Sequence, residues 1–303
     1  MYFPYFRGRQ YELLALKELA QRQLISSNTV IPIVEPIKIS STFNSTLKMY
    51  EDNNMNLSLI LNPEVGELAG EDISMLFNRI NDNIIPAIII NESTEDISDE
   101  LDKYNISLSK ILSILTSRDF VSDYNEMFFK ISPKYTLFPD ERRIRRSIQG
   151  NKVLFEDKFK KQLKNADYLK NVDEFFSEEH LYYAEEGYYG FGDYSIIGNS
   201  YEESGFAPRA VAIHIVYFDN EELLRVHHFV SDSNYGTEDV AGKFYEAVIK
   251  LVNQFENDRK NKTFALDTLI DYARRGYYPG LPTIKKLSIM HHLELVNSYL
   301  SGK

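Results

Sequence analysis

The first two-thirds of the chain alternates short apolar runs with polar, helix-like stretches. In residues 12–22 three leucines and Ala20 recur near one helical face, and residues 72–80 are amphipathic in the same way. Alternation of this kind is typical of parallel strands joined by crossover helices. Eight runs are predicted to be strands: residues 2–6, 31–37, 57–61, 84–90, 111–115, 135–138, 153–155 and 191–197.

Two of these runs indicate strands that are covered on both faces. The segments IPIVEPI (31–37) and IIPAIII (84–90) are apolar at nearly every position, as expected for a parallel sheet buried beneath helices. The fold class that we predict is therefore α/β, a (β/α)8 barrel of the TIM-barrel type. Residues 106–116 fit a helix as well as a strand.

The pattern changes after the eighth run. The segments AVAIHIVYF and LLRVHHFVS are separated only by the polar residues 219–222, which leaves no room for a helix and predicts an antiparallel hairpin over 210–231. With a two-residue tip, His214 would lie opposite His227, and His228 would point to the other face. A slip of one residue would reverse this assignment.

The remainder of the chain is predicted to be helical. Three helical segments are expected, at residues 237–256, 263–275 and 283–300. We expect a barrel with its hairpin insertion over residues 1–235 and C-terminal helices over 236–303 that pack on the barrel, forming one domain overall.

Composition excludes several kinds of site. The 303 residues contain no cysteine, so disulfides, thiolate zinc sites and cysteine nucleophiles are impossible. There is no signal peptide pattern and no apolar run approaching the roughly 20 residues of a membrane span. The predicted location is the cytoplasm, without membrane association.

The formal net charge of -11 argues against a global electrostatic grip on nucleic acid but leaves a local patch open. Two basic runs could form one, although runs at helical spacing are usually solvated faces. They comprise Arg142, Arg143, Arg145 and Arg146, followed by Lys158, Lys160, Lys161 and Lys164.

Polar residues gather where the predicted strands end, which is where (β/α)8 barrels carry their functional groups. Glu35 stands in an apolar run and needs a partner, because a buried ionised carboxylate is costly. Arg7 and Arg9 are the expected partners. They could form a structural salt bridge with Glu35, or they could bind a phosphate near the helix that begins close to Glu12.

A metal site is the alternative use of the strand ends. Carboxylate oxygens suit Mg2+ or Mn2+, which could activate water, although the same carboxylates could simply cap helices. The candidate ligands are Glu35, Glu64, Asp157 and Asp193.

Several stretches together resemble the bacterial and phage family known as Beta protein. They are YFPYFRGRQYELLAL (2–16), PIVEP (32–36), FEDKFKKQLKNADY (155–168), GFGDYSIIG (190–198), and AVAIHIVYF with HHFVSDS (within 210–233). The resemblance implies a barrel-like fold and a gene setting in mobile or host-defence neighbourhoods beside a partner gene. It implies no established reaction.

The leading hypothesis is a defence-associated binding or effector subunit that holds a phosphate-bearing ligand, or a segment of a protein partner from the same operon, at the barrel mouth. The alternatives are a metal-dependent phosphodiesterase or nuclease, and a scaffold without a site. The candidate catalytic residues are Glu35, Asp157, Asp193 and His214. The candidate ligand-binding residues are Arg7, Arg9, Glu12, Asn62, Asn165, Asp167 and Tyr168.

Overall fold

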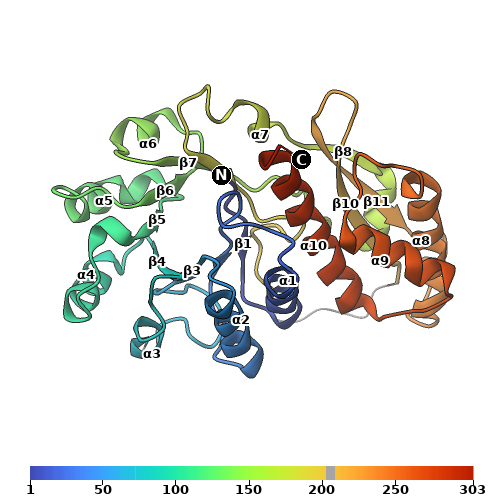
Figure 1. Cartoon of the computed structure of the whole chain (residues 1–303), viewed down its shortest axis with the longest axis horizontal. Coiled ribbons are helices and arrows are strands. Elements are labelled where there is room, and N and C mark those ends of the chain that lie inside the picture. Colours follow the sequence, from blue (N-terminus) through green and yellow to red (C-terminus); the bar gives the residue numbers. More distant parts are fainter. Residues whose placement is uncertain (72, 203–208, 303) are drawn as a thin grey trace. The chain divides into compact units, whose positions relative to one another are not determined.

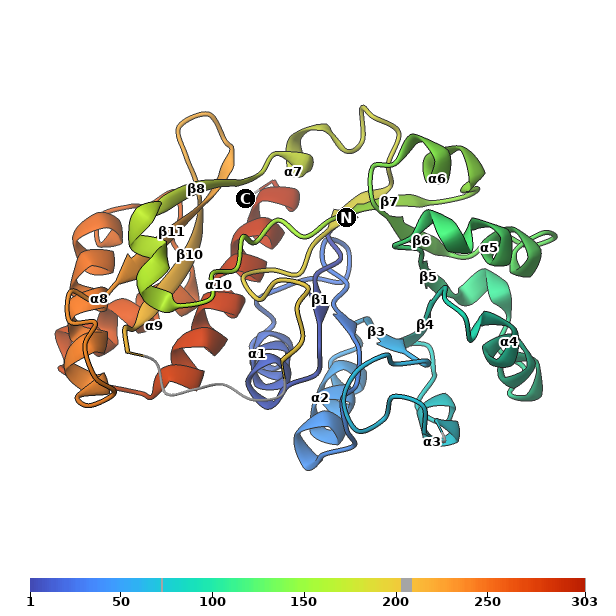
Figure 2. The same cartoon turned by 180° about the vertical axis from the view of Figure 1, so that it is seen from behind.

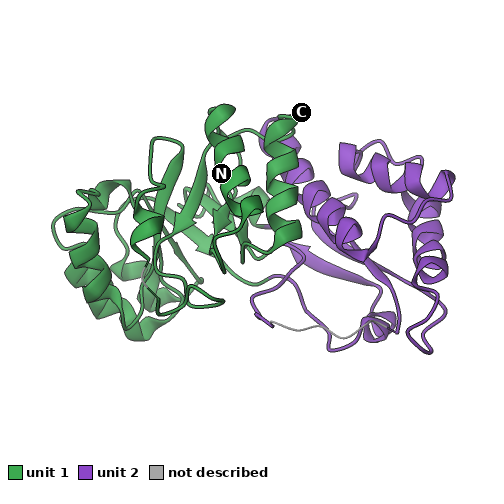
Figure 3. Cartoon of the chain, turned by 90° about the horizontal axis from the view of Figure 1, so that it is seen from below, with its two compact units in different colours: residues 1–157, 179–194 green, residues 158–178, 195–303 purple. Residues whose placement is uncertain are grey.

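The computed structural model describes residues 1–71, 73–202 and 209–302, which fall into two compact units (Figure 3). Unit 1 contains residues 1–157 and 179–194, and unit 2 contains residues 158–178 and 195–303. The expected boundary after residue 235 does not coincide with this division, because the hairpin belongs to unit 2 together with the C-terminal helices.

Unit 1 is an α/β barrel, which confirms the predicted fold class. Its eight strands are all parallel and follow one another in chain order. Each overlaps one of the eight predicted runs, although several strands are shorter than their runs and β7 and β9 begin one residue earlier. They are β1 (Tyr5–Phe6), β2 (Ile33–Val34), β3 (Leu57–Ile60), β4 (Ile84–Ile89), β5 (Leu112–Ile114), β6 (Tyr135–Phe138), β7 (Lys152–Phe155) and β9 (Gly190–Gly192).

The first and last strands close the barrel. Tyr2 bridges to Phe191, and the backbone N–H of Phe3 donates to the carbonyl of Phe191 at 2.8 Å. Glycine is required in β9, because a Cβ on Gly190 or Gly192 would collide with a carbonyl oxygen of the first strand's segment. The GFG sequence therefore allows the two strands to approach.

Helices surround the strands of unit 1 (Figure 1). They are α1 (Gln10–Gln21), α2 (Ser41–Asp52), α3 (Ser74–Phe77), α4 (Thr94–Lys103), α5 (Val121–Met127), α6 (Arg142–Ser147) and α7 (Glu179–Tyr182), with 3-10 turns η1 (Leu108–Lys110) and η2 (Arg118–Phe120). The ambiguous residues 106–116 contain η1 and β5. The first residue of the amphipathic stretch 72–80 lies outside the described residues, and α3 is shorter than the stretch suggested.

The barrel interior is a packed apolar core. Phe3, Tyr5, Ile33, Ile60 and Phe155 are among the buried side chains that fill it. Such an interior is a core and not a pore, so a ligand can bind only at a barrel end or on the outer surface.

Unit 2 contains a three-stranded antiparallel sheet and three long helices (Figure 2). The strands, in spatial order, are β10 (Ala212–Phe218), β11 (Leu224–Val230) and β8 (Asp173–Ser177). The helices are α8 (Val240–Phe255), α9 (Phe264–Arg274) and α10 (Leu281–Leu300), and a 3-10 segment, η3, spans Asn165–Lys170. The hairpin and the three helices were predicted, whereas β8 was not.

The predicted hairpin register is wrong by one residue. His214 lies opposite His228, and His227 lies opposite Ile215. The cause is the turn: the Asp219 carboxylate accepts from the N–H groups of Glu221 and Leu223, and Glu222 adopts φ 62°. This longer turn shifts the second strand and reverses the faces on which His227 and His228 lie.

Among the helices of the described residues, none combines the length and the apolar character that a membrane span requires.

Candidate functional site

The barrel mouth of unit 1 is organised around the fully buried carboxylate of Glu35. One of its oxygens, Oε2, accepts a hydrogen bond from the Tyr5 hydroxyl at 2.7 Å and pairs with the Arg7 guanidinium. The other, Oε1, accepts from the backbone N–H of Glu64 at 2.7 Å. These contacts satisfy the charge that the sequence places in an apolar strand and tie together the ends of β1, β2 and β3.

The Arg7 guanidinium is held in the ion pair with Glu35. Burial disfavours its charged form, but Tyr5 and Glu35 outweigh burial and raise the pKa of the Arg7 guanidinium. Burial and the neighbouring Glu35 carboxylate raise the pKa of the Tyr5 phenol, so it stays protonated and donates. Of the two alternatives left open by the sequence, this arrangement is the structural salt bridge.

The predicted anion position at the start of α1 is occupied by the protein itself. The buried Glu12 carboxylate accepts from the backbone N–H of Arg7 at 3.1 Å and of Arg9 at 3.4 Å. An anion arriving here would meet a negative charge on amides that are already bonded. The geometry of this corner therefore does not suit a phosphate.

Aromatic rings pack beside the ion pair. Tyr194 lies 5.0 Å from Tyr5 and 4.9 Å from Phe155, measured between ring centroids. Burial raises the pKa of the Tyr194 phenol to about 12; Arg7 opposes the rise, and Asp157, Glu35 and Glu64 add to it. Three carboxylates and one guanidinium therefore act on Tyr194, which disfavours an anionic ligand beside this ring.

The four carboxylates proposed as metal ligands do not assemble into a site. Within residues 1–71, 73–202 and 209–302, no group of three or more His, Asp and Glu side chains could hold a metal ion. Glu35 is used as described, and Asp193 accepts from the buried Tyr2 hydroxyl at 2.7 Å. Glu64 accepts from Asn91 Nδ2 at 2.7 Å. This arrangement does not fit Mg2+ or Mn2+.

Asn62, another predicted ligand-binding residue, joins two strands instead. Its amide donates to the Ile89 carbonyl at 2.7 Å and accepts from the Ile89 N–H at 2.9 Å. A cavity of about 260 Å³ next to Asn62 is lined by three carboxylates, those of Glu71, Asp96 and Glu100. A phosphate would be repelled there.

The remaining predicted residues lie in unit 2. Nδ1 of His214 is 2.8 Å from Nδ1 of His228, so one ring donates to the other. The Tyr168 ring packs against both imidazoles, at 4.6 and 4.4 Å between centroids. Burial is the main cause that lowers the pKa of both histidines, which keeps the pair neutral.

Other unit 2 candidates have structural contacts. Asn165 Nδ2 donates to the Ala210 carbonyl at 2.8 Å, and Asp167 forms an exposed ion pair with Lys170 at 2.9 Å. The Tyr168 hydroxyl accepts from the Gln162 N–H at 3.0 Å. These bonds fasten η3 and its flanking residues within unit 2.

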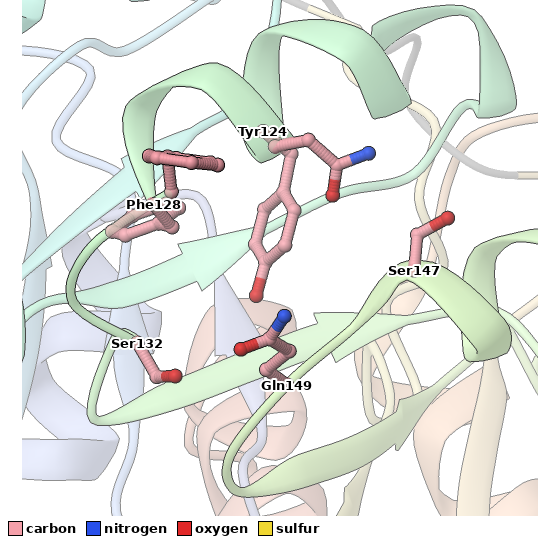
Figure 4. Close-up of a pocket in the computed structure, with 7 residues that line it drawn as sticks. Tyr124, Phe128, Ser132, Ser147 and Gln149 are labelled. Atoms are coloured by element: carbon pink, nitrogen blue, oxygen red, sulfur yellow. The ribbon is translucent and has the colours of Figure 1, made fainter.

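A pocket that the sequence did not reveal lies on the outside of the barrel. Its volume is about 210 Å³, and three aromatic residues, Tyr124, Phe128 and Phe129, form one wall. These residues come from the second half of α5 and the turn that follows it. Figure 4 shows the Tyr124 hydroxyl pointing toward the Gln149 side chain.

The rest of the pocket lining is polar but uncharged: Asn125, Ser132, Ser147 and Gln149. Ser132 precedes β6, and Gln149 precedes β7, so the pocket lies toward the amino-terminal ends of these strands. No ionisable group other than the phenol of Tyr124 lines it.

Helix α6 adjoins this pocket through its last residue, Ser147, and carries the arginine run noted in the sequence. Arg145 is engaged, since it bonds the Glu186 carbonyl at 2.5 Å and stacks over Tyr188. Arg142, Arg143 and Arg146 are exposed, and within the described part of the chain their guanidinium groups have no hydrogen bond or ion pair.

The sequence matches no family model, and comparisons with curated proteins and with solved structures give no match. The resemblance to the Beta protein family therefore stays a prediction.

The Arg7 to Glu35 pair gives a stability prediction. An Arg7→Met substitution would leave a buried carboxylate without its counter-charge, and we expect the free energy of unfolding to fall by about 3–5 kcal/mol. Adding Glu35→Gln should recover part of this loss. The control is Arg22→Met, which removes an exposed pair with Glu18 and should cost under about 1 kcal/mol. Equal losses in urea unfolding for Arg7→Met and Arg22→Met would contradict the account.

The buried histidines of unit 2 give a pH prediction. Burial lowers the pKa of His291 to about 4 and that of His292 to about 3. The unfolded chain, with values near about 6.5, therefore binds protons that the folded chain does not. Stability is full above about 6.5 and falls as the pH drops toward about 4, by about 1–2 kcal/mol for each histidine between pH 7 and pH 5.

His292→Asn isolates one contribution, because the Asn oxygen can take the place of Nδ1 in the 2.9 Å bond to the Ser195 hydroxyl. Urea unfolding from pH 7 to pH 5 should show a shallower pH dependence for this variant. Parent stability that is flat or rises toward pH 5 would refute the prediction.

Proposed function

We propose that the protein binds a phosphate-bearing ligand through the exposed arginines of α6, on the outside of the barrel. The observation that carries the proposal is that Arg142, Arg143 and Arg146 are exposed on one short helix beside a pocket and have no carboxylate partner within the described residues. Guanidinium groups match phosphate oxygens in a bidentate geometry.

In the second basic run, by contrast with the three exposed arginines of α6, two lysines have partners. In unit 2, Lys160 lies 3.4 Å from the Glu174 carboxylate, and Lys161 lies 2.9 Å from the Ser200 hydroxyl and 3.3 Å from Glu202. In a chain with 45 acidic and 34 basic residues, most cations have acidic neighbours available. Arg142, Arg143 and Arg146, three unpaired arginines within five residues, therefore mark a local reversal of charge, which favours an anion.

The proposed role is binding rather than catalysis. The pocket beside α6 contains no histidine, carboxylate or lysine that could transfer a proton. The metal-dependent phosphodiesterase alternative depends on carboxylates that are not gathered in the described residues. The defence setting and the operon partner stay predictions.

We place the phosphate site at α6 and not at the barrel mouth, where the sequence had suggested it. At the mouth, Glu35 neutralises Arg7, and Glu12 occupies the amides at the start of α1. A phosphate at the mouth would have to displace buried carboxylates, whereas the exposed arginines of α6 have no carboxylate partner to displace within the described residues.

The test is calorimetric titration with inorganic pyrophosphate at low salt. The triple variant Arg142→Gln, Arg143→Gln, Arg146→Gln should bind pyrophosphate at least about tenfold more weakly than the parent, because three charge-assisted contacts are lost. These side chains are exposed, so circular dichroism and the melting temperature should hardly change.

A matched control removes the same charge elsewhere: Arg79→Gln, Arg118→Gln, Arg259→Gln, all of which are exposed. This control should retain parental binding. Equal weakening in both triple variants would mean that only net charge matters, and it would overturn the proposed site.

A further inference from the structure

We infer that the phosphate-bearing ligand is a nucleoside phosphate, whose base enters the pocket between α5 and the segment after α6 while its phosphate meets the α6 arginines. The phosphate half of this inference rests on the proposed function. The placement of the base depends only on the pocket, so it can be tested independently of the phosphate site.

Helix α6 reaches the pocket through its last turn. Ser147 lines the pocket, and its hydroxyl donates to the backbone carbonyl of Arg143 at 3.3 Å. Residues four apart share one face of a helix and are separated by about 5.4 Å, one turn, along its axis. The backbone of Arg143 therefore lies one helical turn from Ser147 on the same face of α6, and we place the phosphate at its guanidinium.

One wall of the pocket is aromatic. Phe129 lines the pocket although its side chain is 82% exposed, whereas Phe128 beside it is buried. An exposed phenylalanine at the edge of a pocket offers a face on which a planar base can stack, and such stacking contributes substantially to the binding of single nucleotides.

The remaining pocket lining is polar and uncharged. The side-chain amides of Asn125 and Gln149 make no hydrogen bond with any described residue. Each amide both donates and accepts, which matches the adjacent donor and acceptor atoms on the edge of a nucleobase. A charged headgroup would find no counter-charge inside this pocket.

Contacts within the protein hold the pocket in shape before any ligand binds. The Tyr124 hydroxyl lies 3.1 Å from the Thr136 hydroxyl. Gly150 has φ 78°, and a Cβ there would press on Ser132 at 3.3 Å, so glycine lets the segment carrying Gln149 approach the opposite wall. A preformed pocket reduces the entropy that binding must overcome.

The experiment titrates three probes that separate the two halves of the ligand: adenosine 5′-monophosphate, adenosine, and ribose 5-phosphate. The monophosphate should bind tightest. Phe129→Ala and Gln149→Ala should each weaken the monophosphate and adenosine by about fivefold or more and leave ribose 5-phosphate unchanged. Arg143→Gln should weaken the monophosphate and ribose 5-phosphate but not adenosine.

Tyr235→Ala is the matched control, because this side chain is 89% exposed and lies in unit 2; it should bind all three probes like the parent. All these variants change exposed side chains, so folding should be retained and is checked by melting temperature.

The outcomes distinguish the two proposals. If ribose 5-phosphate binds as tightly as the monophosphate, the base inference is overturned and the phosphate function stands. If adenosine binds with Phe129 dependence while pyrophosphate and ribose 5-phosphate do not bind, the base pocket stands and the proposed function fails. No binding of any probe at millimolar concentration overturns both.

The same chemistry could come from a free nucleotide or from a strand of nucleic acid. A short single-stranded oligoadenylate completes the panel. Binding tighter than that of the monophosphate, and lost in Arg143→Gln, would assign the source to a nucleic-acid strand. Equal or weaker binding would assign it to a free nucleotide.

Discussion

The buried carboxylate of Glu35 is the constraint on which the barrel mouth depends. A charge in the second strand is tolerable only if every oxygen is satisfied, and the protein does this with Tyr5, Arg7 and the N–H of Glu64. The partners come from the ends of β1 and from the segment after β3. One electrostatic requirement therefore holds together the ends of three strands and fixes what this surface can do.

Because Arg7 pairs with Glu35 and Glu12 bonds the amides at the start of α1, the groups that suggested an anion site at the barrel mouth are already in use. Glu35 neutralises the charge of Arg7, and the Glu12 carboxylate accepts a hydrogen bond from the backbone N–H of Arg7 just before α1. What remains near Tyr194 is mainly negative. Three exposed arginines without an ion pair in the described residues lie instead on α6, beside a pocket without charge, and this clustering moves the proposed site away from the end at which barrel enzymes usually work.

The periodic parts of the fold could be predicted from the sequence, because a strand buried on both faces needs a continuous apolar run and a helix needs an amphipathic one. Details set by a single turn could not. The Asp219 side chain lengthens the hairpin turn by one residue and so reverses the histidine faces. Strand β8 was missed, because its residues, DEFFS, lack both an apolar run and regular alternation.

The candidate site could likewise be predicted only in part from the sequence. The charges at the strand ends were recognised, but which of them neutralise one another depends on distances that sequence does not contain. The pocket was not predictable at all, because its wall combines α5 with segments before β6 and β7 and relies on the positive φ of Gly150. The arginine run was visible in the sequence, but the sequence did not show that Arg142, Arg143 and Arg146 lack partners whereas Lys160 and Lys161 have them.

The most direct measurement is chemical-shift mapping of the backbone amides during titration with adenosine 5′-monophosphate. The account predicts that the amides of Phe129, Arg143 and Gln149 shift with a common dissociation constant while those of Arg7, Glu64 and Tyr194 stay in place. Shifts confined to the barrel mouth, with α6 and its pocket unaffected, would contradict it.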